Sequence, residues 1–215
     1  MKKVLLLVLS LYGTIVGAQN IYTPHKEYIY EAKTMIDGKE EVRYISMWAT
    51  DDVWKMDSTQ RQLFYAYHKH CNKDSLTTAW PYSDNVESTG IIETENRIWL
   101  HPPRWNNLEI LEYFPFPEIN KNALCGDKYK RMFLGSVDFL DRWMFLRYKM
   151  TVERIGNKTI IQGKAKSRRG EWVEMIIYDK EKGFTEMEFT TPVGRTIKLK
   201  LIDIIEHKNN CKHPS

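Results

Sequence analysis

The sequence lacks the local motifs that most recognisable enzymes carry. It has no Gly-x-Ser-x-Gly elbow, no His-Glu-x-x-His pair and no glycine-rich phosphate loop, which are the patterns of serine hydrolases, zinc hydrolases and nucleotide-binding enzymes. We therefore expect a non-enzymatic protein without a cofactor. Carboxylate pairs such as Asp51 with Asp52 and Glu93 with Glu95 leave an exported hydrolase open as an alternative, because acid–base chemistry needs side chains of this type.

Beyond residue 18, no apolar run approaches the roughly 20 residues that a membrane-spanning helix needs. The start of the chain is different: Met1-Lys2-Lys3 is basic, residues 4–9 are apolar, and Val16-Gly17-Ala18 is a small-x-small cleavage site. Residues 1–18 are thus predicted to be a secretory signal peptide cleaved near Ala18. The expected product is a single domain over 19–215, in the periplasm or outside the cell, and not an integral membrane protein.

Cysteine is scarce and odd in number. Cys71, Cys125 and Cys211 allow at most one intrachain disulfide, and each lies in a polar, turn-like stretch where crosslinks between loops form easily. The three possible pairings stay open.

Charge is unevenly distributed along the chain. Residues 19–126 hold 11 basic and 16 acidic side chains, whereas residues 127–215 hold 19 and 12. Attraction between the two halves of the fold explains this asymmetry, and a surface for an anionic ligand on the basic half is the alternative. We expect no nucleic acid partner, because the protein is exported and its aromatic residues are not interleaved with basic ones.

Two hairpins stand out by alternation of apolar and polar residues around a turn. The first flanks 191–195, where a register centred on Val193 pairs apolar with apolar and acidic with basic side chains: Phe189 with Ile197, Met187 with Leu199, Glu188 with Lys198 and Glu186 with Lys200. The second flanks Asp37-Gly38, which suits a type I′ turn and places Tyr30 opposite Ile45 and Tyr28 opposite Met47. Such agreement specifies the register, since a slip of one residue turns every side chain over.

Further strands are predicted from short β-branched and aromatic runs bounded by Gly, Asn or Asp, at 53–56, 62–69, 90–95, 97–100, 128–134, 145–154, 159–167 and 172–178. Helix is restricted to 105–113 and a turn at 138–142, and 76–88 is expected to be a long loop. The predicted fold class is all-β with minor α. It is an antiparallel curved sheet forming a half-barrel (clamshell) or open barrel, with one or two short helices.

From Tyr178 onward, a strand, a charged turn containing Gly183 and an amphipathic hairpin follow one another. This stretch resembles the C-terminal sheet of the clamshell-like lipoprotein-carrier fold of Gram-negative envelopes, and that of a broader group of uncharacterised exported β-sheet proteins. The resemblance covers about the last 70 residues. It implies a curved sheet around an apolar groove that binds an acyl chain or another lipid-like ligand. The chain departs from the carriers in its cysteines and in the proline-containing insert 101–126.

Several aromatic residues surround the stiff Pro102-Pro103 segment and are candidates for binding a ligand or partner: Trp99, Arg104, Trp105, Phe114 and Phe116. The alternative is structural, with the prolines protecting an edge strand and Trp99 and Trp105 filling the core. The apolar segment 108–117 is expected either to plug the core or to form a flap over a cavity.

Lys164, Lys166 and Arg168 alternate on one face of a predicted strand and could meet phosphate head groups or an acidic polymer, or form an ordinary solvated face. His68 and His70 share a strand face as weak metal-ligand candidates, but two ligands do not make a zinc site.

The leading hypothesis is an exported protein that binds a hydrophobic or amphipathic, lipid-like ligand on the concave face of its sheet. The alternative is an envelope assembly protein that docks a protein partner.

Overall fold

The computed structural model describes residues 20–55, 57–68, 86–137 and 142–207, without the side chains of 106, 133–137 and 142–144. The predicted signal peptide, His70, Cys71 and Cys211 lie outside these ranges, as do most of the loop expected at 76–88 and of the turn predicted at 138–142, whose last residue Arg142 begins a strand.

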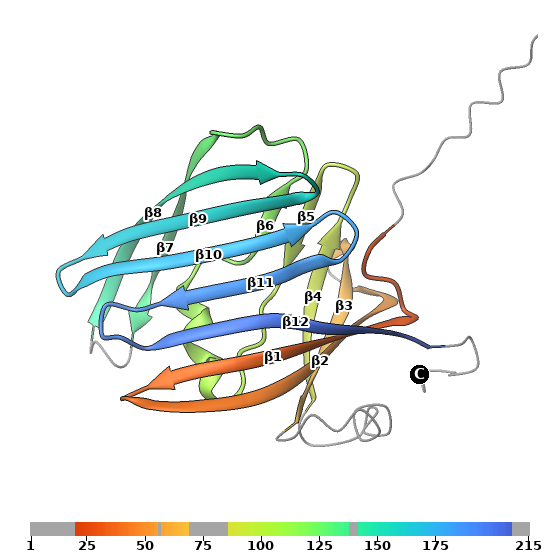
Figure 1. The fold of residues 1–215 in the computed structure, drawn as a ribbon, viewed down its shortest axis with the longest axis horizontal. Helices are drawn as coiled ribbons and strands as arrows, with labels where there is room; N and C mark the ends of the chain where they lie inside the picture. Colours follow the sequence, from red (N-terminus) through yellow and green to blue (C-terminus); the bar gives the residue numbers. More distant parts are fainter. Residues whose placement is uncertain (1–19, 56, 69–85, 138–141, 208–215) are drawn as a thin grey trace, which may run out of the picture.

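Twelve strands of this described part form one antiparallel sheet (Figure 1). They are β1 (Lys26–Ile36), β2 (Lys39–Trp54), β3 (Asp57–His68), β4 (Val86–Glu93), β5 (Arg97–Leu100), β6 (Glu118–Asn120), β7 (Lys128–Val137), β8 (Arg142–Ile155), β9 (Lys158–Ser167), β10 (Gly170–Asp179), β11 (Gly183–Thr190) and β12 (Thr196–Glu206). Their order in the sheet is β6-β5-β4-β3-β2-β1-β12-β11-β10-β9-β8-β7. The predicted all-β fold class is confirmed, and the sheet is open with β6 and β7 at its edges.

Both predicted hairpins have the expected register. Phe189 pairs with Ile197 and Glu188 with Lys198 across β11 and β12, and Tyr30 pairs with Ile45 across β1 and β2. Apolar residues of these pairs face the core while the charged ones face outward, as period-two alternation requires.

The structure corrects two predicted boundaries and adds one strand. The break expected at Asp51-Asp52 is wrong, because β2 runs through it with register irregularities opposite β3, between Ala49 and Val53 and again at Trp54. Residues 86–88 belong to β4 instead of the preceding loop. The short edge strand β6 was not predicted at all, since three residues after a proline-rich stretch carry no usable periodicity.

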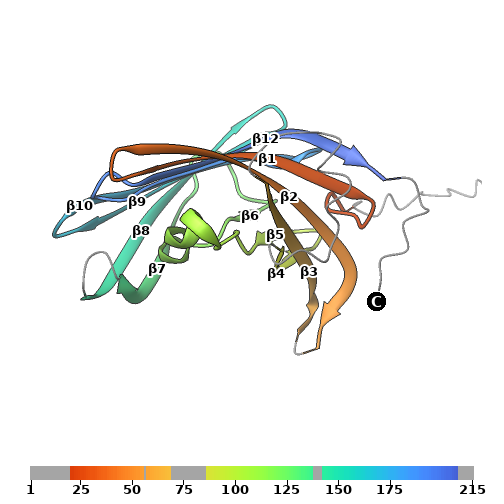
Figure 2. The ribbon, with the colours of Figure 1, turned by 90° about the horizontal axis from the view of Figure 1, so that it is seen from below.

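The sheet arches over the 101–117 segment, whose 3-10 helix η1 (Asn106–Tyr113) lies on its concave side (Figure 2). Phe114 is 2% exposed, and its ring centroid lies 5.5 Å from that of Trp172 and 5.1 Å from that of Phe189. Leu108, Ile110 and Leu111 are buried with it. The segment is therefore the core plug of the two alternatives, and it occupies part of the concave side that was expected to hold a ligand.

Residues just after the predicted signal peptide are anchored in the fold. The buried carboxylate of Glu93 accepts hydrogen bonds from the backbone amides of Ile21 (2.8 Å) and Tyr22 (3.3 Å) and pairs with Arg61 at 3.3 Å. The buried Tyr22 hydroxyl accepts from the Phe184 amide at 2.8 Å. Within the described ranges no helix is long and apolar enough to cross a bilayer.

Candidate functional site

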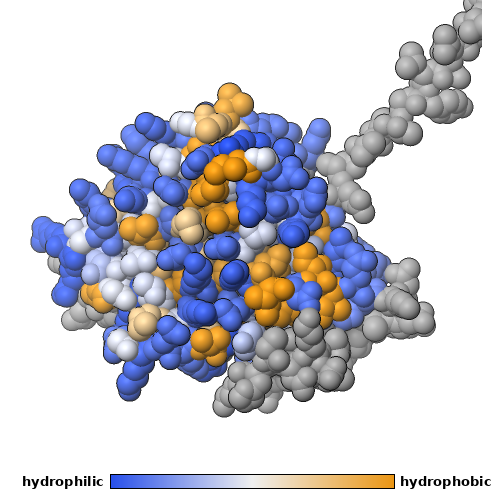
Figure 3. Space-filling view, in the orientation of Figure 1, coloured by the Kyte–Doolittle hydropathy of each residue, from blue (hydrophilic) through white to orange (hydrophobic). Residues whose placement is uncertain are grey.

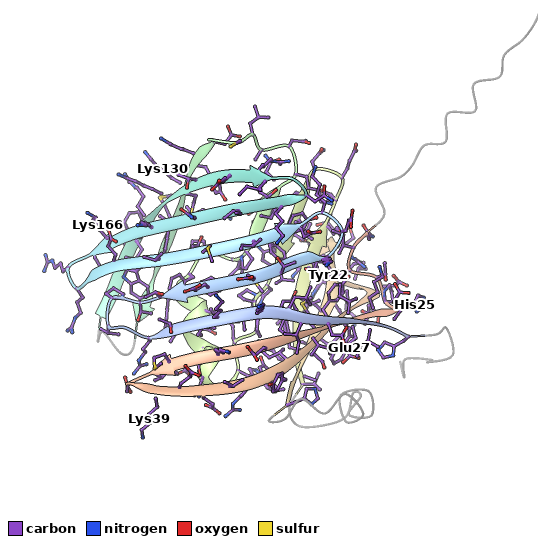
Figure 4. All side chains as sticks on the ribbon, viewed as in Figure 1. Tyr22, His25, Glu27, Lys39, Lys130 and Lys166 are labelled. Atoms are coloured by element: carbon purple, nitrogen blue, oxygen red, sulfur yellow. The ribbon has the colours of Figure 1, made fainter. Side chains whose placement is uncertain are left out.

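The two faces of β8 differ sharply in composition. Along the strand Leu146, Tyr148 and Met150 are buried, whereas the alternate side chains Arg147 and Lys149 are exposed on the outer, convex face. Because successive side chains of a strand point to opposite faces, the exposed residues Lys130, Arg147, Lys149, Lys164 and Lys166 share this outer surface. In Figure 4, Lys130 of β7 and Lys166 of β9 both project outward from the part of the sheet that these strands form.

Three lysines lie side by side across this face. Lys130 of β7 pairs with Lys149 of β8, which pairs in turn with Lys164 of β9. Directly opposed residues in neighbouring strands have Cβ atoms only about 4.5–5.5 Å apart, so like charges here repel one another. No described residue forms an ion pair with any of these three ammonium groups. The fold thus keeps a concentration of positive charge that does not contribute to its stability.

An open groove of about 680 Å³ lies along β8 and β9, includes Lys149 and Lys164 of this row, and is called the basic groove below. It is lined by Phe145, Arg147, Lys149, Thr151, Gln162, Lys164, Lys166 and Glu171. Four of these eight side chains are basic and one is acidic, and the acidic one pairs loosely with Lys166 at 3.9 Å between exposed groups. An exposed pair of this kind contributes little, so the groove keeps a net positive charge.

Apolar surface accompanies the charge. Phe145 is 55% exposed at the groove, and the guanidinium carbon of Arg147 lies 6.0 Å from the centre of its ring. Met132, paired with Arg147 across β7 and β8, is 68% exposed. The face of the molecule seen in Figure 3 is mainly hydrophilic, with separate hydrophobic areas. Together these groups offer charge and apolar contact to one amphipathic ligand.

Beneath the groove, the inner face of the same strands holds one buried carboxyl group. Glu174 of β10 is 1% exposed and lies opposite Gly163 of β9, whose missing side chain leaves room for it. None of the described residues donates a hydrogen bond to either carboxyl oxygen. Burial raises the pKa of Glu174 to about 8, with the Arg131 charge acting in the opposite direction. Glu174 is therefore largely protonated at neutral pH.

The sequence-predicted site residues fall into separate places. Lys164 and Lys166 line the basic groove, and Arg168 is exposed in the turn beyond the end of β9. Phe114 lies in the core. Trp99 and Phe116 form an aromatic cluster with His101, their ring centroids being 5.5 Å apart. The predicted basic residues and the predicted aromatic residues therefore do not line one common pocket.

Arg104 and Trp105 are held by a buried acid at the start of β4. The Glu87 carboxylate accepts hydrogen bonds from the Arg104 amide at 2.9 Å and from the Tyr67 hydroxyl at 2.5 Å. The Trp105 ring stacks on Tyr67 with centroids 6.1 Å apart and remains 41% exposed. The expectation that Trp105 fills the core is thus wrong. So is the expectation of an edge strand, because β5 pairs with both β4 and β6.

The remaining polar candidates are engaged in structural contacts. Nε2 of His68 lies 3.3 Å from the Ser46 hydroxyl, and His70 is outside the described residues. Burial, with the nearby Arg104 guanidinium, lowers the pKa of His101 to about 4, so this imidazole is neutral at pH 7. No group of three potential metal ligands occurs in the part of the chain that the structure describes. Glu93 binds the N-terminal segment and Arg61, which gives it a structural task.

Comparison with known proteins gives one weak structural resemblance. No protein-family model and no curated protein sequence matches this chain. A candidate exported protein with a YmcC-like fold from Bacteroides fragilis is structurally similar, with a TM-score of 0.36 and 8% sequence identity over 85% of this chain and 96% of that chain.

Sequence reasoning missed half of the basic groove. Arg147 and Lys149 alternate along their strand just as Lys164 and Lys166 do, and Gly156-Asn157 lies midway between the two pairs. Counting outward from this turn places Lys149 opposite Lys164, so the signal was present in the sequence.

Proposed function

We propose that the protein is exported and binds an anionic amphipathic, lipid-like ligand through the basic groove without catalysing a reaction. The observation that carries the proposal is the row Lys130–Lys149–Lys164, in which like charges face one another across three strands. Such a row costs stability in the unbound protein. A phosphate or carboxylate group bound above it recovers that cost and forms charge-assisted hydrogen bonds.

Shape and apolar surface support the same ligand class. The groove volume of about 680 Å³ lies within the range of about 300–1,000 Å³ that is usual for small-ligand sites. Phe145 and Met132 offer exposed apolar contact at the same face. The outer face is favoured over the concave side as the ligand site, because Phe114 and the residues buried around it occupy part of the concave side.

Export is supported by the N-terminal sequence, in which a basic start, an apolar run and Val16-Gly17-Ala18 follow in the order of a secretory signal. The proposed location is the periplasm or the cell exterior.

Titration calorimetry with dodecyl phosphate, kept below its micelle concentration, tests the function. We expect saturable binding that weakens as salt rises, since charge attraction is screened. Dodecyl maltoside, which has the same tail without the charge, should bind much more weakly. Equal affinity for both amphiphiles, or binding of neither, contradicts the proposal. Native mass spectrometry of protein purified from its own envelope should in addition show an anionic lipid that copurifies.

Docking of an envelope protein is the second candidate, and the exposed Trp105 favours it. Its backbone amide lies 3.3 Å from the buried Glu87 carboxylate, so the indole is held rigidly at the surface. A photocrosslinker at Arg104 should capture one dominant partner in cells, and Trp105→Ala should abolish that product. A diffuse set of crosslinks, unchanged by the substitution, contradicts docking at this place.

A further inference from the structure

A second, smaller cavity lies on the inner face at the opposite ends of these strands. It has a volume of about 220 Å³, and its lining includes Lys121, Arg154, Thr159, Tyr178 and Lys180. The cations come from three elements: Lys121 follows β6, Arg154 lies near the end of β8, and Lys180 follows β10. We call this cavity the anion pocket below.

Strand pairing explains why these groups converge. Arg154 of β8 is the direct partner of Thr159 of β9, and Thr159 is the direct partner of Tyr178 of β10. The three side chains thus form one lateral row, and Thr159 and Tyr178 are buried. Directly paired residues lie on the same face of a sheet, so the guanidinium and the two hydroxyl groups share one wall.

This wall of the pocket has more hydrogen-bond donors than the neighbouring described residues have acceptors for. Nη2 of Arg154 donates to the Lys121 carbonyl at 2.7 Å, but its buried Nε finds no acceptor among the described residues. The hydroxyl of the buried Thr159 and the ammonium of the exposed Lys180 likewise have no acceptor among the described residues. A buried donor without an acceptor is costly, and native folds rarely keep one without reason.

Acidic groups near the pocket are already occupied. Glu93 Oε1 lies 4.0 Å from Lys121 Nζ, but its carboxylate also accepts from the Ile21 and Tyr22 amides and pairs with Arg61. Asp179 accepts hydrogen bonds from the Glu181 and Lys182 amides in the turn after β10. Neither carboxylate supplies the acceptor that the buried Arg154 Nε lacks.

We propose that the anion pocket binds a small oxyanion, namely phosphate, sulfate or a carboxylate. Two or three acceptor oxygens on one charged group match the Arg154 fork, the Thr159 hydroxyl and the Lys180 ammonium. Ile21 also lines the pocket, so the bound anion contacts the segment that directly follows the predicted signal peptide. The site is independent of the basic groove, which lies on the other face of the sheet.

The test measures thermal unfolding in inorganic phosphate, sulfate or acetate against chloride at equal ionic strength. The host is the full-length mature chain carrying Lys149→Glu and Lys164→Glu, so that the basic groove does not contribute. We expect saturable stabilisation by at least one of the three anions. Lys180→Gln should then weaken its binding about tenfold, the usual effect of losing one charge-assisted hydrogen bond.

Lys182→Gln is the matched control, because Lys182 is exposed in the same turn and does not line the pocket. It should leave anion binding unchanged. Stabilisation no greater than that of chloride for all three anions overturns the proposal. Equal weakening by Lys180→Gln and Lys182→Gln overturns it as well, since general charge attraction would then explain the effect. Loss of dodecyl phosphate binding bears only on the proposed function of the groove.

Discussion

The outer face of the sheet carries lysines at two places, and their neighbours differ. On β11 and β12, Lys198 lies 3.7 Å from Glu186 and 3.5 Å from Glu188, and Lys200 pairs with Glu186 in the strand register. On β7, β8 and β9, Lys130, Lys149 and Lys164 face one another. Both places are solvated strand faces of the same sheet, which excludes burial as the cause of the difference.

In the paired ladder of β11 and β12, Lys198 and Lys200 each face a glutamate, which fixes the register, and Lys198 also faces Lys33 of β1 on its other side. The lysine row of β7–β9 works against folding. A surface that opposes the stability of its own fold, and also exposes Phe145 and Met132, is better explained by a ligand that supplies the missing negative charge.

The largest expected effect comes from reversing the charge at the basic groove. Lys149→Glu with Lys164→Glu should weaken dodecyl phosphate binding by up to about a thousandfold, since each basic residue near an anionic lipid contributes about 1 kcal/mol and reversal counts twice. Calorimetry measures the loss. The matched reversal, Lys198→Glu with Lys200→Glu, should retain binding but lower the melting temperature. Similar affinities of the two double variants would remove the distinction between the two surfaces.

Glu174→Gln tests the inner face beneath the basic groove through the pH dependence of stability. Because burial raises the pKa of Glu174 to about 8, the folded state binds a proton that the unfolded state releases near its ordinary pKa of 4.5. Wild-type stability should therefore fall, relative to the glutamine variant, as pH rises from about 4.5 to 8, by up to about 1.4 kcal/mol for each pH unit. Urea denaturation of both proteins at pH 5, 6.5 and 8 measures it. Parallel stability profiles would mean that the carboxyl group is not buried as described.

The two faces of β9 should respond differently to small changes. A Cβ atom at Gly163 would lie 2.6 Å from both Met150 Sδ and Glu174 Cγ. Gly163→Ala should thus destabilise by about 1–3 kcal/mol through overpacking, whereas the neighbouring outer change Gln162→Ala should cost less than about 0.5 kcal/mol. Denaturant unfolding compares the two variants. An equal response would show that β9 does not separate a packed face from a solvated one.

The smallest expected effect is on the free energy of unfolding, which should change in opposite directions when a lysine is neutralised on the two surfaces. Lys149→Gln should raise the free energy of unfolding by a few tenths of a kcal/mol by relieving repulsion, and Lys198→Gln should lower it by a similar amount. High salt should diminish both effects. Thermal unfolding at low and at high salt resolves them. Destabilisation by both substitutions would argue that the lysine row has a structural role.

Much of the fold could be predicted because its information is local. Strands joined by tight turns carry their register in the sequence, as Glu188 and Lys198 show, and the outer row of β8 and β9 could have been counted from Gly156-Asn157. The placement of Phe114 was less accessible, since an apolar segment between prolines suits a plug and a flap equally well. Its burial depends on contacts with Trp172 and Phe189, which are distant in sequence.

The anion pocket could not be predicted from the sequence. Its walls come from the end of β8, the start of β9 and the turn after β10, and from Lys121, which follows the unpredicted strand β6. The Arg154–Thr159–Tyr178 row follows from two hairpin registers. The nearby Lys121 depends on how the far edge of the open sheet approaches β8, and Arg154 reaches its carbonyl only there. No periodic pattern encodes that approach.

Mapping where dodecyl phosphate binds tests the central claim most directly. Amide chemical shifts of the isotope-labelled protein, titrated with this amphiphile, should change around Lys149 and Lys164 on β8 and β9 and stay constant around Lys198 and Lys200 on β12. Changes concentrated instead around Phe114 and the residues that enclose it would contradict the account, because the ligand would then occupy the interior beneath the sheet.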